Sequence, residues 1–143
     1  MATALDIISR SLRLIGAVAE GEVPSAAQAA DGLVALQAML GDWETRGVRL
    51  GAAVDATYGT ATTIAVPVTH LNALALNLAV LLAPEYGRGE ALQAIIPQAE
   101  RSFDALLAQY HKPPKIAVDP ALVVQSGLIN GIDDATASEY GMT

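Results

Sequence analysis

The chain has 143 residues, of which 52% are hydrophobic and only 4% aromatic, and its net charge is −7. This length suits one domain, and a core so poor in rings must be built from Ala, Leu, Val and Ile. The absence of cysteine excludes disulfide frameworks and thiolate metal sites. The basic residues are few and scattered, so tight binding of nucleic acid through neutralisation of its phosphates is not expected.

The first predicted helix begins after Thr3, because the Thr3 hydroxyl and Asp6 three residues later form a capping box. Its apolar positions recur on one face as far as Gly16, which should end the helix. The same N-terminus alternates polar and apolar residues and lacks the charged start and solid apolar run of a signal peptide, so secretion is not expected.

The second predicted helix follows Pro24, where Ser25 and Gln28 repeat the capping signature. Its apolar residues fall at alternating spacings of four and three and form one packing seam: Ala29, Leu33, Leu36, Leu40 and Trp43. Gly32 and Gly41 each lower helix propensity by about 1 kcal/mol. We therefore expect a neighbouring backbone to come close at both glycines.

Residues 48–68 change character, since TYGTATTIAVPV is rich in Thr, Val and Ile around a glycine. This composition predicts a short extended or hairpin arm. Two short strands are marginal alone, so the arm should lean on the helices or on another copy.

The third predicted helix opens near Thr69, runs to about Ala83 and is apolar on nearly every side. Such a helix is either a membrane span or the centre of a bundle. Because Asn72 and Asn77 interrupt a stretch already shorter than the roughly 20 residues a bilayer needs, we expect the centre of a bundle and no membrane partner.

A fourth helix is predicted from Glu90 to about residue 111, with one apolar face: Leu92, Ile95, Ile96, Ala99, Phe103, Leu106 and Tyr110. Residues 1–111 are therefore predicted to form an all-α, antiparallel four-helix bundle. The arm at 48–68 lies between its second and third helices.

Residues 112–143 lose the helical pattern and are predicted to form an extended C-terminal arm, stiffened at its root by Pro113 and Pro114. Seven of its residues are too apolar for an idle solvated tail: Ile116, Val118, Leu122, Val123, Val124, Leu128 and Ile129. Either they fold back onto their own bundle, or they become ordered on a partner surface. We expect the second, with these seven as the partner-binding residues.

Catalytic chemistry is not indicated. Neither His70 nor His111 has a His, Asp or Glu at a spacing that would form a metal pair, and no phosphate-binding loop or nucleophile motif is present. Glu85 and Glu100 would serve as acid and base of a hydrolase only if folding brought them together. The expectation is a protein that is not an enzyme and uses no cofactor or metal.

The order of three blocks is more informative than any one of them: ALDIISRSLRLIG (residues 4–16), PSAAQAADGLVALQAMLGDW (residues 24–43) and LALNLAVLLAPEYG (residues 74–87). Together they resemble the head-to-tail adaptor proteins of tailed bacteriophages. They resemble in particular the tail accessory factor, or packaged-DNA-stabilisation protein, of short-tailed phages. The resemblance covers roughly residues 4–110, and residues 48–68 and those after Lys112 match no motif of that family.

The resemblance implies a virion structural protein, made in the host cytoplasm and placed at the head-tail junction. Such subunits form a homo-oligomeric ring, expected to be a dodecamer, below the portal protein. The ring extends the DNA channel, retains packaged DNA without binding it specifically, and offers a platform to the next tail or nozzle component. Two alternatives remain open from the residues alone: a carboxylate-based cell-wall hydrolase, and a small helical regulatory protein that binds a partner.

Overall fold

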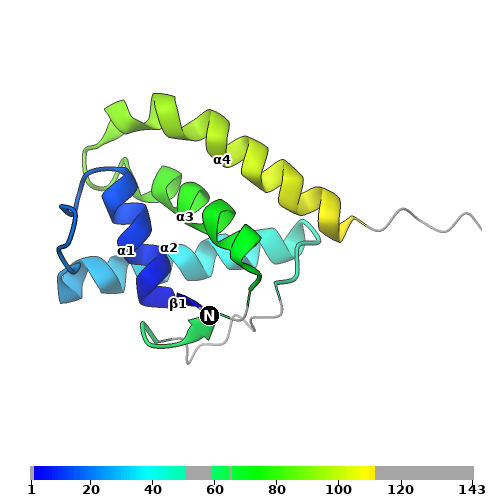
Figure 1. Ribbon diagram of the computed structural model, residues 1–143, viewed down its shortest axis with the longest axis horizontal. Coiled ribbons are helices and arrows are strands. Elements are labelled where there is room, and N and C mark those ends of the chain that lie inside the picture. The colour runs from blue at the N-terminus through cyan, green and yellow to red at the C-terminus, as the bar shows by residue number, and fades with distance from the viewer. Residues whose placement is uncertain (1, 51–58, 65, 112–143) are drawn as a thin grey trace, which may run out of the picture. The chain divides into compact units, whose positions relative to one another are not determined.

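Four helices form the core of the computed structural model, which describes residues 2–50, 59–64 and 66–111 (Figure 1). The elements in chain order are β1 (Ala2–Thr3), α1 (Ala4–Leu14), α2 (Ala26–Thr45), β2 (Thr63–Ile64), α3 (Val68–Leu82) and α4 (Gly89–Tyr110). The helices pack against one another, which confirms the predicted all-α fold. The C-terminal arm, residues 112–143, lies outside the described residues.

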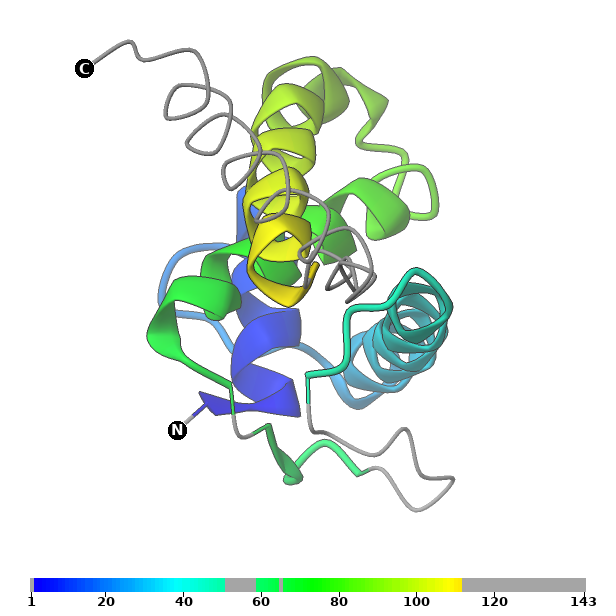
Figure 2. The same ribbon diagram turned by 90° about the vertical axis from the view of Figure 1, so that its right-hand side faces the viewer.

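The helix α3 packs against each of the other three helices. It runs antiparallel to α4, and the turn between them reverses at Gly87, whose φ of 64° is a left-handed conformation that glycine adopts without strain. The first helix lies steeply across α2 in both views (Figures 1 and 2), so these two helices cross and do not run side by side.

The N-terminus of α1 has all its free backbone donors satisfied. The capping box predicted from Thr3 and Asp6 is present, with the Thr3 hydroxyl accepting from the Asp6 backbone N–H. The Thr3 backbone N–H and hydroxyl both donate to the Asp6 carboxylate at 2.8 Å and hold its pKa below the ordinary value. This interaction stabilises the fold at neutral pH and is lost as the pH falls through the lowered pKa.

The segment predicted as an arm supplies the carbonyl acceptors for the other free backbone N–H groups at the start of α1. The backbone N–H groups of Ala4 and Leu5 donate to the carbonyls of Thr62 and Thr60 at 2.9 and 3.0 Å. Strand β2 pairs antiparallel with β1, so within the described residues its partner is the N-terminal strand and not a second strand of the same segment. The extended form leaning on the bundle is thus what 59–64 adopts, while residues 51–58 and 65 lie outside the described part.

The glycines of α2 behave differently from each other. A Cβ built on Gly32 would lie 2.5 Å from Cγ2 of the fully buried Ile8 on α1, so a neighbouring helix does come close there, but through a side chain and not through the predicted backbone. At Gly41 nothing lies within 4 Å of such a Cβ, so the expectation is wrong for that residue. In the part of the chain that the structure describes, Gly41 faces open space.

The core is aliphatic, as the composition predicts, and α3 is its centre. Leu74 and Leu78 of α3 are fully buried, and so are Ile8 and Leu12 of α1 and Leu36 of α2. No charged residue lies anywhere in α3, which is why it tolerates enclosure by three other helices.

We predict that Leu78→Asp destabilises the protein by several kcal/mol, a loss comparable to the whole stability of a small domain, because it buries an unpaired charge. Leu81→Asp is the matched control, since Leu81 lies on the same helix but is exposed. Urea unfolding followed by circular dichroism measures both variants. If Leu78→Asp is as stable as the parent, Leu78 is not in the core.

The two α2 glycines provide an opposed pair of substitutions. Gly41→Ala should raise stability by about 0.5–1 kcal/mol, because alanine is the better helix former and the space is open. Gly32→Ala should lower it by about 1–3 kcal/mol, because the new methyl displaces Ile8. Equal effects of the two substitutions in thermal or urea unfolding would contradict this packing of α1 on α2.

Candidate docking groove

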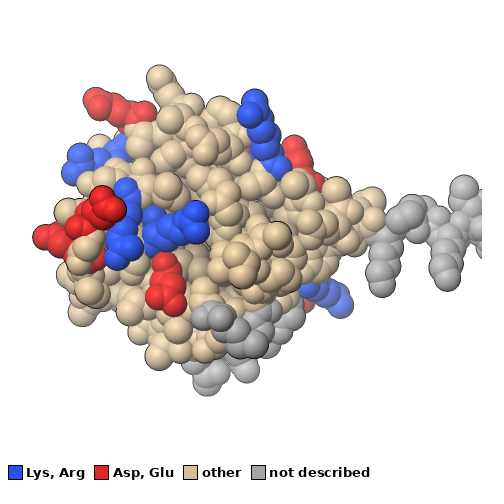
Figure 3. Space-filling view, viewed as in Figure 1, with Lys and Arg blue, Asp and Glu red and all other residues tan. Residues whose placement is uncertain are grey.

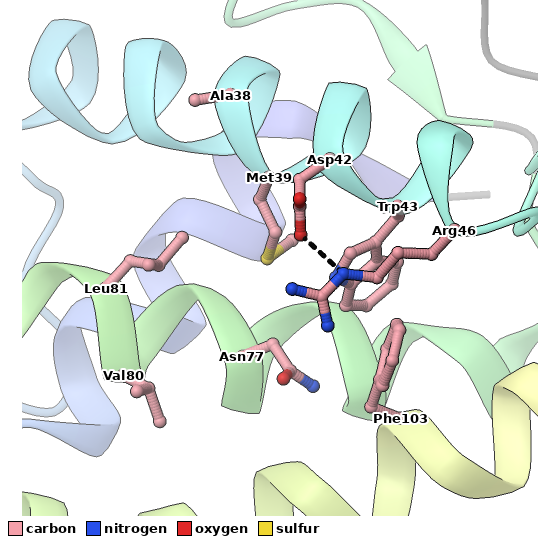
Figure 4. Close-up of a pocket in the computed structure, with 9 residues that line it drawn as sticks. All are labelled: Ala38, Met39, Asp42, Trp43, Arg46, Asn77, Val80, Leu81 and Phe103. Atoms are coloured by element: carbon pink, nitrogen blue, oxygen red, sulfur yellow. Dashed lines mark ion pairs between the residues drawn. The ribbon is translucent and has the colours of Figure 1, made fainter.

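A groove with a volume of about 320 Å³ lies between α2, α3 and α4 (Figure 4). Its lining residues are Ala38, Met39, Asp42, Trp43, Arg46, Asn77, Val80, Leu81 and Phe103. Six of these nine are apolar, and Leu81 keeps 46% of its surface exposed. A groove of this size and character suits one or two apolar side chains of a partner.

An aromatic pair closes one end of the groove. The rings of Trp43 and Phe103 have centroids 5.1 Å apart and are tilted by 46°, a geometry that aromatic pairs favour. The Arg46 guanidinium lies 5.5 Å from the centre of the Phe103 ring, and its Nε is 2.9 Å from the Asp42 carboxylate. These contacts join the end of α2 to α4 and hold that end of the groove in place.

The floor of the groove contains one polar side chain, Asn77 of α3, which joins the two helices of the antiparallel pair. Its Nδ2 donates to the Ala73 carbonyl of its own helix at 2.8 Å and to the Ala99 carbonyl of α4 at 3.2 Å. Asn77 therefore has its donors satisfied by backbone, and a ligand gains little by displacing it.

Charges are distributed in small mixed clusters. On the face shown in Figure 3, acidic and basic side chains lie next to each other, and a broad uncharged area separates the clusters. Two ion pairs are present in the described residues, Arg46 with Asp42 and Arg49 with Glu44, and both are exposed to solvent. Exposed pairs of this kind add little stability. The charged side chains that are not in such pairs are therefore more informative about what this surface binds.

The carboxylates considered for a hydrolase do not come together. Glu85 lies in the turn before α4, whereas Glu100 lies in the middle of α4, and both are exposed. Roughly 16 Å of helix lies between the start of α4 and Glu100. Because Glu85 precedes that helix, the two residues lie at different levels along α4, which disfavours the close spacing at which two carboxyl groups flank a glycosidic bond.

The two histidines of the chain are His70 in α3 and His111 at the end of α4. His70, only 5% exposed, has its Nε2 2.8 Å from Gln109 Oε1 of α4, and its ring packs 5.7 Å from that of Tyr110. His111 is the C-cap residue of α4, and its backbone N–H donates to the Leu107 carbonyl. Among the described residues no three His, Cys, Asp or Glu side chains are grouped as a metal site.

Among the residues that the structure describes, Asp6 and Tyr86 have displaced pKa values, and neither lines the groove. The pKa of Asp6 is lowered by its hydrogen bonds from Thr3 at the start of α1. The pKa of Tyr86, in the turn after α3, is raised by burial and then by the nearby Asp31 and Glu85 carboxylates. Neither faces a concavity with a second catalytic group, so these shifts reflect capping and packing.

The seven apolar residues predicted to bind a partner, between positions 116 and 129, lie outside the described residues, and their role stays a prediction. The groove itself is not predicted by the sequence. The sequence pattern puts Trp43 and Phe103 on two separate core faces, and only the crossing of the helices brings their rings together. In the described part of the chain, no helix is long and apolar enough to cross a membrane.

Trp43 is the single tryptophan of the chain and lines the groove, so its fluorescence should report an occupant. We predict that an apolar dye quenches Trp43 and that Leu81→Gln weakens this binding several-fold, because Leu81 supplies exposed apolar lining. Val34→Gln is the control, since Val34 is 67% exposed on α2 but does not line the groove. Equal weakening by both variants would show that the dye binds elsewhere.

No family model, no curated protein and no solved structure matches this chain. Its residues and their geometry therefore carry the functional proposal.

Proposed function

We propose that this chain is a structural head-to-tail adaptor of a tailed phage virion. Copies of it form a ring, expected to be a dodecamer, below the portal protein. The ring extends the DNA channel, retains the packaged DNA and offers a platform to the next tail or nozzle component. In this proposal the chain is not an enzyme and uses no cofactor or metal.

The observation that carries the proposal is apolar surface that the core does not use. Val34 on α2 is 67% exposed, and Val68 at the start of α3 is 82% exposed. Ala38, one turn after Val34, lines the groove together with Leu81 of α3, so apolar surface continues from the outer side of α2 into the groove. A subunit that contacts neighbours in a ring needs such faces in addition to its core.

The resemblance to phage adaptors fits the arrangement of the helices. Its three blocks correspond to α1, to α2 and to the second half of α3 with the turn that follows. These three helices pack against one another. The blocks are therefore parts of one folding unit, which supports treating their order as a single signal.

The charge of the chain suits a wall beside DNA. A net charge of −7 repels phosphate, so a channel lined by this protein leaves the DNA mobile. The exposed Arg46 and Arg49 lie beside carboxylates, which lowers their value as phosphate contacts.

The alternatives make different predictions about mass and turnover. A cell-wall hydrolase would need Glu85 or Glu100 for turnover, and the helix between them disfavours that pairing. A small regulatory protein would stay monomeric when mixed with portal particles, whereas an adaptor adds a ring of mass to them. Native mass spectrometry of the mixture separates these two cases.

We predict that deletion of residues 113–143 leaves a folded bundle that no longer attaches stably to portals. Burial of the seven apolar side chains, at about 1.5–3 kcal/mol each, favours attachment and offsets part of the entropy cost of ordering the arm on a partner. Cosedimentation with purified portal particles measures attachment, and circular dichroism confirms that the truncated protein is folded.

The matched control keeps the arm at full length and replaces its seven apolar residues, between positions 116 and 129, by serine. This variant should also fail to attach, because the apolar side chains and not the chain length provide the binding. If the truncated protein assembles on portals as well as the full chain, the arm is not an anchor and the helical faces hold the ring.

A further inference from the structure

Two arginines of α1 each donate a hydrogen bond to a neutral acceptor and have no carboxylate partner among the described residues. Arg10 donates from Nη2 to Asn72 Oδ1 of α3 at 3.0 Å, and Arg13 donates from Nη2 to the backbone carbonyl of Glu22 at 3.2 Å. Both acceptors are neutral. Among the described residues neither arginine has a carboxylate oxygen within 4 Å, in contrast to Arg46 and Arg49.

The two arginines border a concavity of about 340 Å³, separate from the groove between α2, α3 and α4. Its lining residues are Arg10, Arg13, Leu14, Val18 and Glu20. Leu14 is 40% exposed, whereas Val18 is buried. The concavity thus combines two positive charges with an apolar wall.

This combination selects a kind of ligand. A guanidinium held by a neutral acceptor keeps its full charge and its remaining donors for a carboxylate, which it binds in a bidentate geometry. With the Glu20 carboxylate in the same lining, the two arginines leave only a small net positive charge there, which is weak attraction for a polyanion such as DNA. A peptide with a carboxylate next to an apolar side chain fits better.

The chain itself carries such a peptide. After Lys115 it contains no basic residue, and Ile132 is followed directly by Asp133 and Asp134. From His111 to Asp133 an extended chain spans up to about 70 Å, more than twice the roughly 30 Å diameter of a small domain. The arm is therefore long enough for its acidic end to reach a neighbouring copy.

We propose that the concavity at Arg10 and Arg13 binds the segment 132–134 of a second copy of this chain. The two aspartates of that segment pair with the two arginines, and Ile132 packs against Leu14. The inference rests on the proposed function for the presence of neighbouring copies. It assigns a link between subunits that is distinct from attachment to the portal.

The test uses two full-length variants whose own arms are repelled from the site. One is Asp133→Lys/Asp134→Lys, with a basic site and a basic arm, and the other is Arg10→Glu/Arg13→Glu, with an acidic site and an acidic arm. Labelled synthetic peptides of residues 126–143, natural or with the same lysine substitutions, are titrated into each variant by fluorescence anisotropy at low salt.

We expect the first variant to bind the natural peptide at least tenfold more tightly than the lysine peptide. The second variant should show the reverse preference. As a control, Arg88→Glu/Arg101→Glu is added to the first variant. These exposed arginines lie elsewhere, and their substitution changes the net charge by the same amount as Arg10→Glu/Arg13→Glu. The control should alter the affinity for the natural peptide less than twofold.

Three results would overturn the inference. They are no binding of the natural peptide to the first variant, no reversal of the peptide preference in the second variant, or a tenfold or greater loss of affinity for the natural peptide in the control. Binding of a DNA oligonucleotide that depends on Arg10 and Arg13, without peptide binding, would mean that these arginines face DNA. None of these experiments measures attachment to portals, so this inference can be wrong while the proposed function is right.

Discussion

The enclosure of α3 is the constraint on which the rest of the structure depends. A helix with no charged residue and few polar ones has to be covered on most sides, and the described part of the chain has three other helices with which to cover it. That requirement sets the steep crossing of α1 and the antiparallel return of α4. It also leaves the outer side of α2 without a covering element among the described residues, and the exposed Val34 and one wall of the groove lie there.

Local signals in the sequence predict the helices well. The capping boxes at Thr3 and Ser25 are local in sequence, since each involves residues three apart, and both are present. The central position of α3 follows from its composition alone. These features depend on the residues of one segment, so no knowledge of the neighbouring segments is needed.

The features that the sequence does not predict depend on how distant segments meet. Gly32 and Gly41 have the same effect on helix propensity, yet only Gly32 lies under Ile8, because α1 crosses α2 at that turn. The partner of β2 is a strand at the start of the chain, whereas the composition of residues 48–68 by itself favours a local hairpin. The groove likewise needs three helices in their final places before its lining exists.

The pairing of β1 with β2 has a consequence for how the chain tolerates change. Val48 and Leu50 on one side, and Ile64 and Val66 on the other, are buried in the same core. The connection between Leu50 and Gly59 is therefore tethered at both ends, and each doubling of the length of such a connection costs only about 0.6 kcal/mol in loop closure. A change of length there should cost the helices little stability, which makes this connection a place for adapting one core to different neighbours.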